Sequence, residues 1–171
     1  RDSISFVQQV QFAHLLQCIV ISRKSAVTMD YHLLLSVWTM RENVMNTTAS
    51  IFYERWSPRA FSATSMPAPD LLTILEAARW APSAFNIQPW RFLYSHRDDA
   101  QWQTYLGLLD PFNASWAHNA SALVFVLSDT VMPGDDRQVQ KSSRYNSFDA
   151  GAAWAQLALQ ATSLGYQAHA M

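Results

Sequence analysis

The sequence predicts a domain of the α+β class, because segments with helical periodicity alternate with short apolar runs that have the composition of strands. The chain has 171 residues, which fits one domain of ordinary size. Half of the residues are hydrophobic and 15% are charged, so there are enough apolar side chains for a core. We therefore expect a single folded domain of helices and strands.

The first 44 residues differ in texture from the rest of the chain. They contain short apolar patches, such as 12–21, without clear capping or turn signals. This patch is too short to cross a bilayer, which takes about 20 apolar residues, and it resembles a signal peptide only faintly. We therefore expect residues 1–44 to be a poorly specified extension and residues 45–171 to form the domain, starting near Met45.

The first predicted helix of the domain covers residues 70–81. Its apolar side chains recur at helical spacing, and Asp70 suits the positive end of the helix dipole. Pro67 and Pro69 precede it, as is common at a helix start, and Pro82 ends it, because proline cannot continue a helix.

Two strands and a helix are predicted in the middle of the chain. Residues 90–95 are short and aromatic, and residues 122–128 form an apolar run typical of a strand that is buried on both faces. Between them, residues 98–109 are expected to form a surface helix. Residues 131–146 are charged and contain proline and glycine, so we expect a flexible loop there.

The longest predicted helix covers residues 148–164. Ser147 is suited to cap its start, and Gly165 lies where a C-terminal cap belongs. One apolar stripe runs along it, either as the core of a dimer or as part of the monomer's own core; it consists of Trp154, Leu157, Ala158, Ala161 and Leu164.

Composition and motifs exclude several classes of function. Twelve basic and thirteen acidic side chains give a net charge of −1, which does not suggest nucleic-acid or membrane binding. The single cysteine, Cys18, excludes an internal disulfide and a thiolate zinc cluster and is compatible with a reducing compartment. The five histidines lack metal-ligand spacing, and no phosphate-binding glycine loop or G-x-S-x-G elbow occurs.

Two polar segments stand out from this background. Residues 55–61, Arg-Trp-Ser-Pro-Arg-Ala-Phe, place two arginines and a hydroxyl close together, a grouping that can bind a phosphate but can also be a solvated basic turn. Residues 81–92 run from the helix end through Asn86 and Gln88 into the aromatic strand. These two amides can bind the edge of a heterocycle or tie down the loop backbone.

The order of these segments resembles the nitroreductase family of flavin enzymes. The resemblance begins with R-x-S-x-R-x-F and A-P-S-x-x-N-x-Q-P-W-x-F, and it continues through residues 110–121, the apolar strand and residues 148–171. It covers about residues 52–171, whereas residues 1–44 match nothing in the pattern. It implies a three-layer α/β/α fold, with a mixed, mainly antiparallel sheet flanked by helices, and a chain that is incomplete at the C-terminus.

The resemblance also implies an FMN enzyme that works as a homodimer, with NAD(P)H as electron donor. Arg55 and Ser57 would face the FMN phosphate and ribityl chain, with Trp56 contributing from the same turn. Arg59 would reach the N1 and O2 edge of the flavin ring, and Asn113 would bind its polar edge.

Three further residues, Pro82, Ser83 and Asn86, would come from the opposite protomer and close the pocket over the ring. Gln88 and Trp90 match the motif and are interpreted as structural supports. Asp149 is left without a role. No side chain is expected to act as a catalytic acid, base or nucleophile, because the cofactor is the reactive group.

The leading hypothesis is therefore a cytoplasmic oxidoreductase that transfers hydride from NAD(P)H through FMN to an electron-poor acceptor, such as a nitroaromatic compound or a quinone. An alternative is a flavin-binding or degenerate dimerisation module without turnover. This alternative is favoured because, by the resemblance, the sequence stops before the family's glycine-containing segment at the flavin N5 and before the basic residues that complete its phosphate site. A third reading, a partner-binding helical domain, rests only on the apolar stripes.

Overall fold

A computed structural model describes residues 13–23, 48–132 and 142–171. Four strands form one sheet in the order β2-β3-β1-β4, and each described pair is antiparallel. The strands are β1 (Ala13–Ser22), β2 (Trp90–His96), β3 (Ala122–Asp129) and β4 (Gln167–Ala170). The helices are α3 (Ile51–Glu54), α4 (Ala68–Arg79), the short 3₁₀ helix η3 (Ala84–Asn86), α5 (Trp102–Leu106), α6 (Pro111–Ala117) and α7 (Asn146–Ser163).

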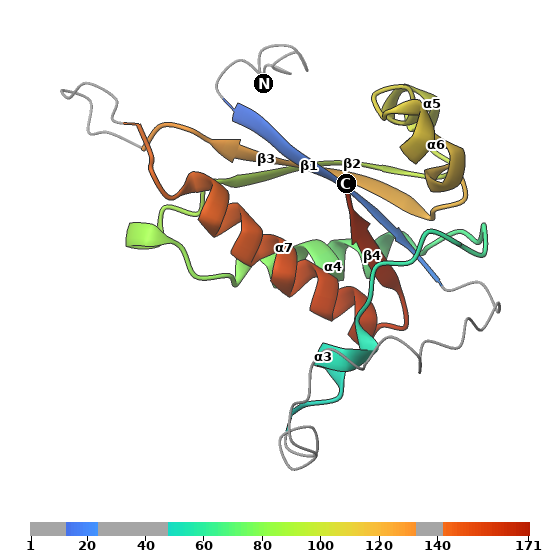
Figure 1. Cartoon of the computed structure of the whole chain (residues 1–171), viewed down its shortest axis with the longest axis horizontal. Helices are drawn as coiled ribbons and strands as arrows, with labels where there is room; N and C mark the ends of the chain where they lie inside the picture. The colour runs from blue at the N-terminus through green and yellow to red at the C-terminus, as the bar shows by residue number, and fades with distance from the viewer. Residues whose placement is uncertain (1–12, 24–47, 133–141) are drawn as a thin grey trace.

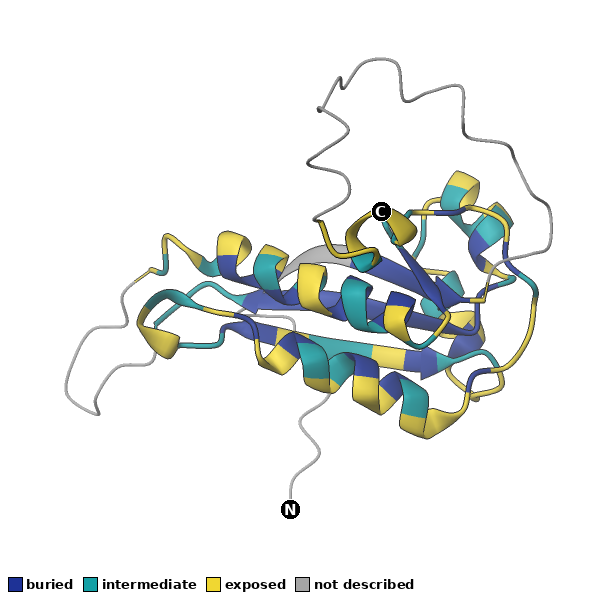
Figure 2. Ribbon diagram, turned by 90° about the horizontal axis from the view of Figure 1, so that it is seen from below, coloured by how far each residue is buried: buried dark blue, intermediate teal, exposed yellow. Residues whose placement is uncertain are grey.

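The elements are arranged in three layers, as expected. The long helices α4 and α7 lie side by side on one face of the sheet, while α5 and α6 lie on the other (Figure 1). Figure 2 shows buried and exposed residues alternating along both long helices, and their buried residues pack in one cluster with residues of the sheet. No helix in the described parts of the chain has the length and apolar character that crossing a membrane would take.

Strand β3 explains why the sheet is covered on both sides. Seven of its eight residues are buried, because successive side chains of a strand point to opposite faces. Ala122, Val124 and Val126 pack in the cluster under α4 and α7, whereas Leu123 and Phe125 pack against α5 and α6. The expectation of a strand buried on both faces is confirmed.

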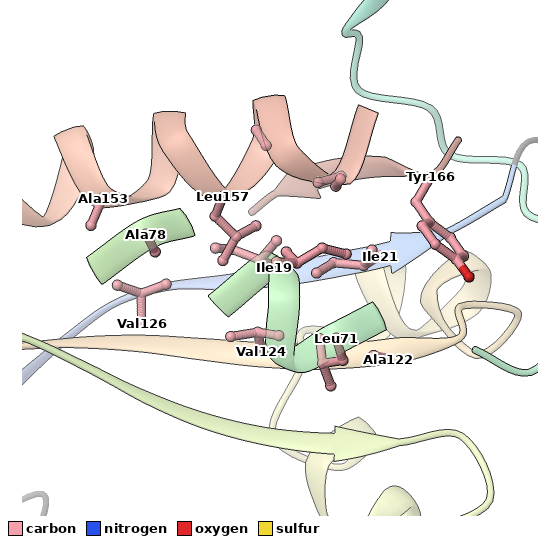
Figure 3. Packing of buried hydrophobic residues seen from close by; sticks show 14 of the residues in the cluster. Ile19, Ile21, Leu71, Ala78, Ala122, Val124, Val126, Ala153, Leu157 and Tyr166 are labelled. Atoms are coloured by element: carbon pink, nitrogen blue, oxygen red, sulfur yellow. The ribbon is translucent and has the colours of Figure 1, made fainter. Parts of the chain in front are cut away.

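Strand β1 corrects the expectation that residues 1–44 lie outside the domain. Ala13–Ser22 is an inner strand, paired with β3 on one side and β4 on the other. Ile19 and Ile21 lie in the core with Leu157 of α7 (Figure 3), while Cys18 and Val20 face the opposite layer. A strand buried on both faces lacks the alternating pattern that identifies a strand. The rest of residues 1–44, apart from Arg23, lies outside the described residues.

The two long helices begin and end close to their expected boundaries. α4 has prolines at its start and is followed by Pro82. Ser147 does not cap α7, because the helix already begins at Asn146. Its N-cap residue is Tyr145, whose side chain makes no capping hydrogen bond. Gly165 ends α7 with φ +80°, and Tyr166 N–H donates to the carbonyl of Ala161 at 2.8 Å, as in a Schellman motif.

The predicted surface helix at 98–109 is shorter in the structure. Helix α5 begins at Trp102, because Asp99 Oδ2 accepts a hydrogen bond from the backbone N–H of His96 at 2.8 Å and thereby stabilises a turn. Helix α6 was not predicted separately. Asp110 caps it by accepting from Phe112 N–H at 2.9 Å, and Pro111 occupies the first turn.

Candidate functional site

The first group of candidate residues lies in the segment that follows α3. Arg55 is at the C-cap of this helix in an extended conformation, and residues 56–60 are neither helix nor strand. Nη1 of Arg55 donates to Oγ of Ser57 at 3.4 Å. The guanidinium and the hydroxyl therefore lie close enough to bind one anion together, which fits the requirement of a phosphate group.

Trp56, between them, is anchored through its backbone. Its N–H donates to Oε1 of Gln167 at 3.0 Å, and Nε2 of the same glutamine donates to the carbonyl of Glu54 at 3.2 Å. The segment is thus attached to β4, and the side chains of Arg55 and Ser57 project from a fixed turn. Among the described residues, the recorded ion pairs are Arg79 with Glu76 and Arg91 with Asp129; neither involves this turn.

Arg59 and Asn113 are brought into the same region by helix α6. The guanidinium carbon of Arg59 lies 5.7 Å from the ring centroid of Phe112, which precedes Asn113 in the first turn of α6. Arg59 is exposed and Asn113 is half-buried. The structure therefore places the Arg59 guanidinium beside the helix turn that carries Asn113.

The second group lies in the loop between α4 and β2. Oγ of Ser83 accepts a hydrogen bond from Gln88 N–H at 2.9 Å, while Pro82 and Asn86 are exposed. Phe85 and Asn86 have φ of +54° and +55°, a left-handed conformation that asparagine tolerates better than most residues. The loop therefore presents Asn86 and the 83% exposed side chain of Phe85 to the outside.

Gln88 and Trp90, interpreted from the sequence as structural supports, lie at the end of this loop and at the start of β2. Trp90 is buried in the core. Gln88 has φ +53°, and its backbone N–H donates to Oγ of Ser83. Asp149 also acquires a role: its Oδ2 accepts from Ala84 N–H at 3.1 Å, and its side chain is buried. It therefore attaches the loop to the first turn of α7.

The two groups lie at opposite ends of helix α7. The Ser83–Asn86 loop is hydrogen-bonded to Asp149, near the start of α7. The Arg55 turn is hydrogen-bonded to Gln167, just beyond the end of α7. The 18 residues of α7 span roughly 27 Å at 1.5 Å per residue. Figure 1 shows the same separation, with α3 at one end of α7 and the loop before β2 at the other. One chain does not bring the two groups together.

Sequence reasoning did not assign Gln167 or His169, which both hold the Arg55 turn. Nδ1 of His169 lies 3.1 Å from the carbonyl oxygen of Ser57 and 3.0 Å from that of Pro58. Their signal in the sequence is their spacing, because residues two apart on a strand share one face, but no local pattern indicates which segment they contact.

Two further observations concern chemistry. Burial raises the pKa of the Tyr166 phenol, and its hydrogen bond to Asp70 Oδ2 at 2.6 Å raises it further, so this group is a structural donor. Within residues 13–23, 48–132 and 142–171, no cluster of three or more histidine, cysteine or acidic side chains could hold a metal ion.

The apolar stripe of α7 belongs to the monomer's own core. Leu157, Ala158 and Ala161 are at most 1% exposed and pack against α4 and the sheet. Trp154 and Leu164 are partly buried and pack against the same cluster. Of the two roles considered for this stripe, the structure therefore assigns it to the interior of the chain.

The outward face of α7 is a second, separate row of side chains at helical spacing. We define it by Phe148, Gly151, Ala155 and Leu159. The first three are exposed and Leu159 is half-buried. Around Gly151 the space is open, since an added Cβ would meet no atom within 4 Å. The row is thus apolar, and at Gly151 and Ala155 its side chains are small enough for another element to approach the helix backbone closely.

Comparisons with known proteins give consistent results. The nitroreductase family profile matches residues 53–107. A crystal structure of an oxidoreductase containing FMN is 52% identical, with a TM-score of 0.69, and the match covers 71% of this chain and 61% of that one. A nitroreductase-type protein from Desulfovibrio desulfuricans, solved in complex with FMN, shares the fold with 24% identity and a TM-score of 0.54, over 67% and 62% of the two chains.

A curated relative is known only as a 15.4 kDa protein of Mycolicibacterium smegmatis. It is 45% identical over 73 residues, which are 43% of this chain and 45% of that protein. The chain therefore spans less than two thirds of the length of each of these three relatives.

Proposed function

We propose that this chain, which belongs to the nitroreductase family, forms part of an FMN-dependent oxidoreductase. When bound, FMN would supply the redox chemistry by accepting hydride from NAD(P)H and passing it to an electron-poor acceptor, such as a nitroaromatic compound or a quinone. The observation that carries the proposal is the pairing of Arg55 with Ser57, together with the contact of Arg59 with Phe112 in the first turn of α6.

Arg55 and Ser57 would bind the FMN phosphate and the adjoining ribityl chain. A guanidinium and a hydroxyl within 3.4 Å of each other can donate to different oxygens of one phosphate. Trp56 would contribute from the same turn. The support for this assignment is the chemistry of the donors together with the anchoring of their backbone to β4.

Arg59 and Asn113 would bind the polar edge of the flavin ring. A fixed cation at the N1 and O2 edge stabilises negative charge that develops there on reduction, and an amide can donate or accept as the ring requires. The contact of Arg59 with Phe112, the neighbour of Asn113, supports a shared role.

Pro82, Ser83 and Asn86 would act on the flavin of a second copy of the chain. They lie at the far end of α7 from the Arg55 turn, so a homodimer related by a two-fold axis would join each group to its complement. The outward face of α7 supports such an interface, as do the exposed rings of Phe85 and Phe148, which are 83% and 81% exposed.

A cytoplasmic location is part of the proposal. It is supported by the one cysteine of the sequence, which is a buried free thiol in the structure, as is usual in reducing compartments.

The direct test is to purify the protein and measure its flavin content, its affinity for added FMN and its oxidation of NADH and NADPH with a quinone or nitroaromatic acceptor. Tight FMN binding with acceptor-dependent oxidation would support the proposal. FMN binding without oxidation would leave the alternative of a binding module without turnover, and no affinity for FMN would contradict both.

A further inference from the structure

We propose that Gln167 and His169 are positioning residues that preorganise the Arg55 turn for the phosphate of the flavin. This inference rests on the proposed function and adds to it the pair of β4 side chains that determines how well the phosphate is recognised. Neither residue needs to touch the cofactor, because each acts on the backbone that carries Arg55, Ser57 and Arg59.

Gln167 holds the peptide groups on both sides of Arg55. Its Nε2 donates to the carbonyl of Glu54, the residue before, and its Oε1 accepts from the N–H of Trp56, the residue after. The side chain is only 7% exposed, so both bonds are shielded from competing water. This two-point attachment fixes the direction in which the Arg55 side chain leaves the backbone.

His169 holds the next part of the same turn. Its Nδ1 lies within hydrogen-bond distance of two carbonyl oxygens, those of Ser57 and Pro58. Both are acceptors, so Nδ1 carries the proton. The ring also lies 4.8 Å from the ring of Trp116 in α6, which connects the turn to the helix that carries Asn113.

The segment at 56–60 is neither helix nor strand, so these side-chain bonds are important for its shape. An arginine loses much rotamer freedom when it binds an anion, and a fixed backbone reduces the additional ordering that binding requires. Loss of the attachment should therefore weaken binding of the phosphate more than binding of the ring.

The experiment compares the affinities for FMN and for riboflavin, which lacks the phosphate. Gln167→Met removes both hydrogen bonds of the side-chain amide but keeps a similar side-chain length. Gln103→Met, on the exposed surface of α5, is the matched control. We expect Gln167→Met to bind FMN about tenfold more weakly, which corresponds to the loss of about one net hydrogen bond, with riboflavin affinity unchanged. The control should match wild type for both ligands.

A second pair of variants tests His169 in the same assay. His169→Phe keeps an aromatic ring beside Trp116 but removes the donor, whereas His169→Asn retains an N–H near the position of Nδ1. We define the FMN preference as the ratio of the affinity for FMN to the affinity for riboflavin. We expect this ratio to fall in the phenylalanine variant and to be largely kept in the asparagine variant. In an Arg55→Ala background, Gln167→Met should have little further effect on FMN affinity, because the phosphate contact that it supports is already absent.

The outcomes separate the two proposals. Unchanged FMN preference in Gln167→Met and His169→Phe, with wild-type FMN binding intact, would overturn the positioning role alone. Equal losses for both flavins would also overturn it, since they would indicate general destabilisation. A wild-type protein that binds neither flavin would refute the proposed function, and this inference with it.

Discussion

The carboxylate of Asp149 accepts a hydrogen bond from the backbone N–H of Ala84 at 3.1 Å, although the two residues are 65 positions apart in the sequence. This contact joins the loop that carries Ser83 and Asn86 to the first turn of α7. Because the Asp149 side chain is only 5% exposed, the Ala84 N–H would be left without its acceptor if the carboxylate were removed.

We expect Asp149→Ala to lower the free energy of unfolding by about 1–3 kcal/mol, the cost of leaving the part-buried N–H of Ala84 without its acceptor. Asp149→Asn should lose less, because an amide oxygen can still accept the bond. Urea denaturation followed by circular dichroism measures both values. Equal stability of the alanine variant and wild type would show that the contact does not hold the loop.

Strand β1 should be essential to the fold. Ile19 is fully buried, so Ile19→Ala should cost about 2–5 kcal/mol. Leu72→Ala, at a position on α4 that is 53% exposed, should cost much less and serves as control.

Deleting residues 1–44 should abolish cooperative unfolding, because β3 and β4 would lose the strand between them. A truncated chain with unchanged melting temperature would disprove this role of β1.

The Cys18 thiol should make stability fall at high pH. Burial raises its pKa from 9.0 to about 12, so between these values the unfolded chain releases the proton while the folded chain keeps it. The stabilisation is therefore complete below pH 9.0 and is lost as the pH rises toward the folded value.

Cys18→Ala removes this contribution. Its stability relative to wild type should therefore improve when denaturation is measured at increasing pH from about 8 to about 11. Parallel stability curves for the two proteins over this range would contradict the burial argument.

Much of the central fold is predictable from local sequence. The helix predicted at 70–81 is observed as Ala68–Arg79, and the strand predicted at 122–128 as Ala122–Asp129. Prolines, a glycine cap and a long apolar run are strong local signals, so these elements were found. Strand β1 is missed because a strand buried on both faces has no alternating pattern, and β4 is missed because its four residues are too few to show one.

The candidate site is predictable only in part. Arg55, Ser57 and Arg59 were found through residue types and spacing, since charged donors close in sequence remain close in space. The contact of Arg59 with Phe112 and the attachment to Gln167 depend on tertiary packing over more than 50 residues. The distance between the Arg55 turn and the Asn86 loop depends on the length and direction of α7, which only the structure provides.

The outward face of α7 should form the contact between two copies. Ala155 is exposed at the middle of this face, and an arginine there would place a long charged side chain where two helices should pack closely. We expect Ala155→Arg to shift the mass in light scattering from dimer to monomer. Gln103→Arg, on α5 in the opposite layer, should leave the mass unchanged. A dimer that persists in the Ala155 variant would exclude this face.

The most direct test of a site shared between two copies is complementation between two defective chains. Arg55→Ala should impair the phosphate-binding group and Asn86→Ala the opposite group, so each variant alone should bind FMN poorly. If the two are mixed equally and allowed to exchange, each mixed dimer has one cleft without either lesion. The mixture should then recover about a quarter of the wild-type sites, since half of the dimers are mixed. No recovery of FMN binding, although mixed dimers form and both variants are defective alone, would contradict the shared site.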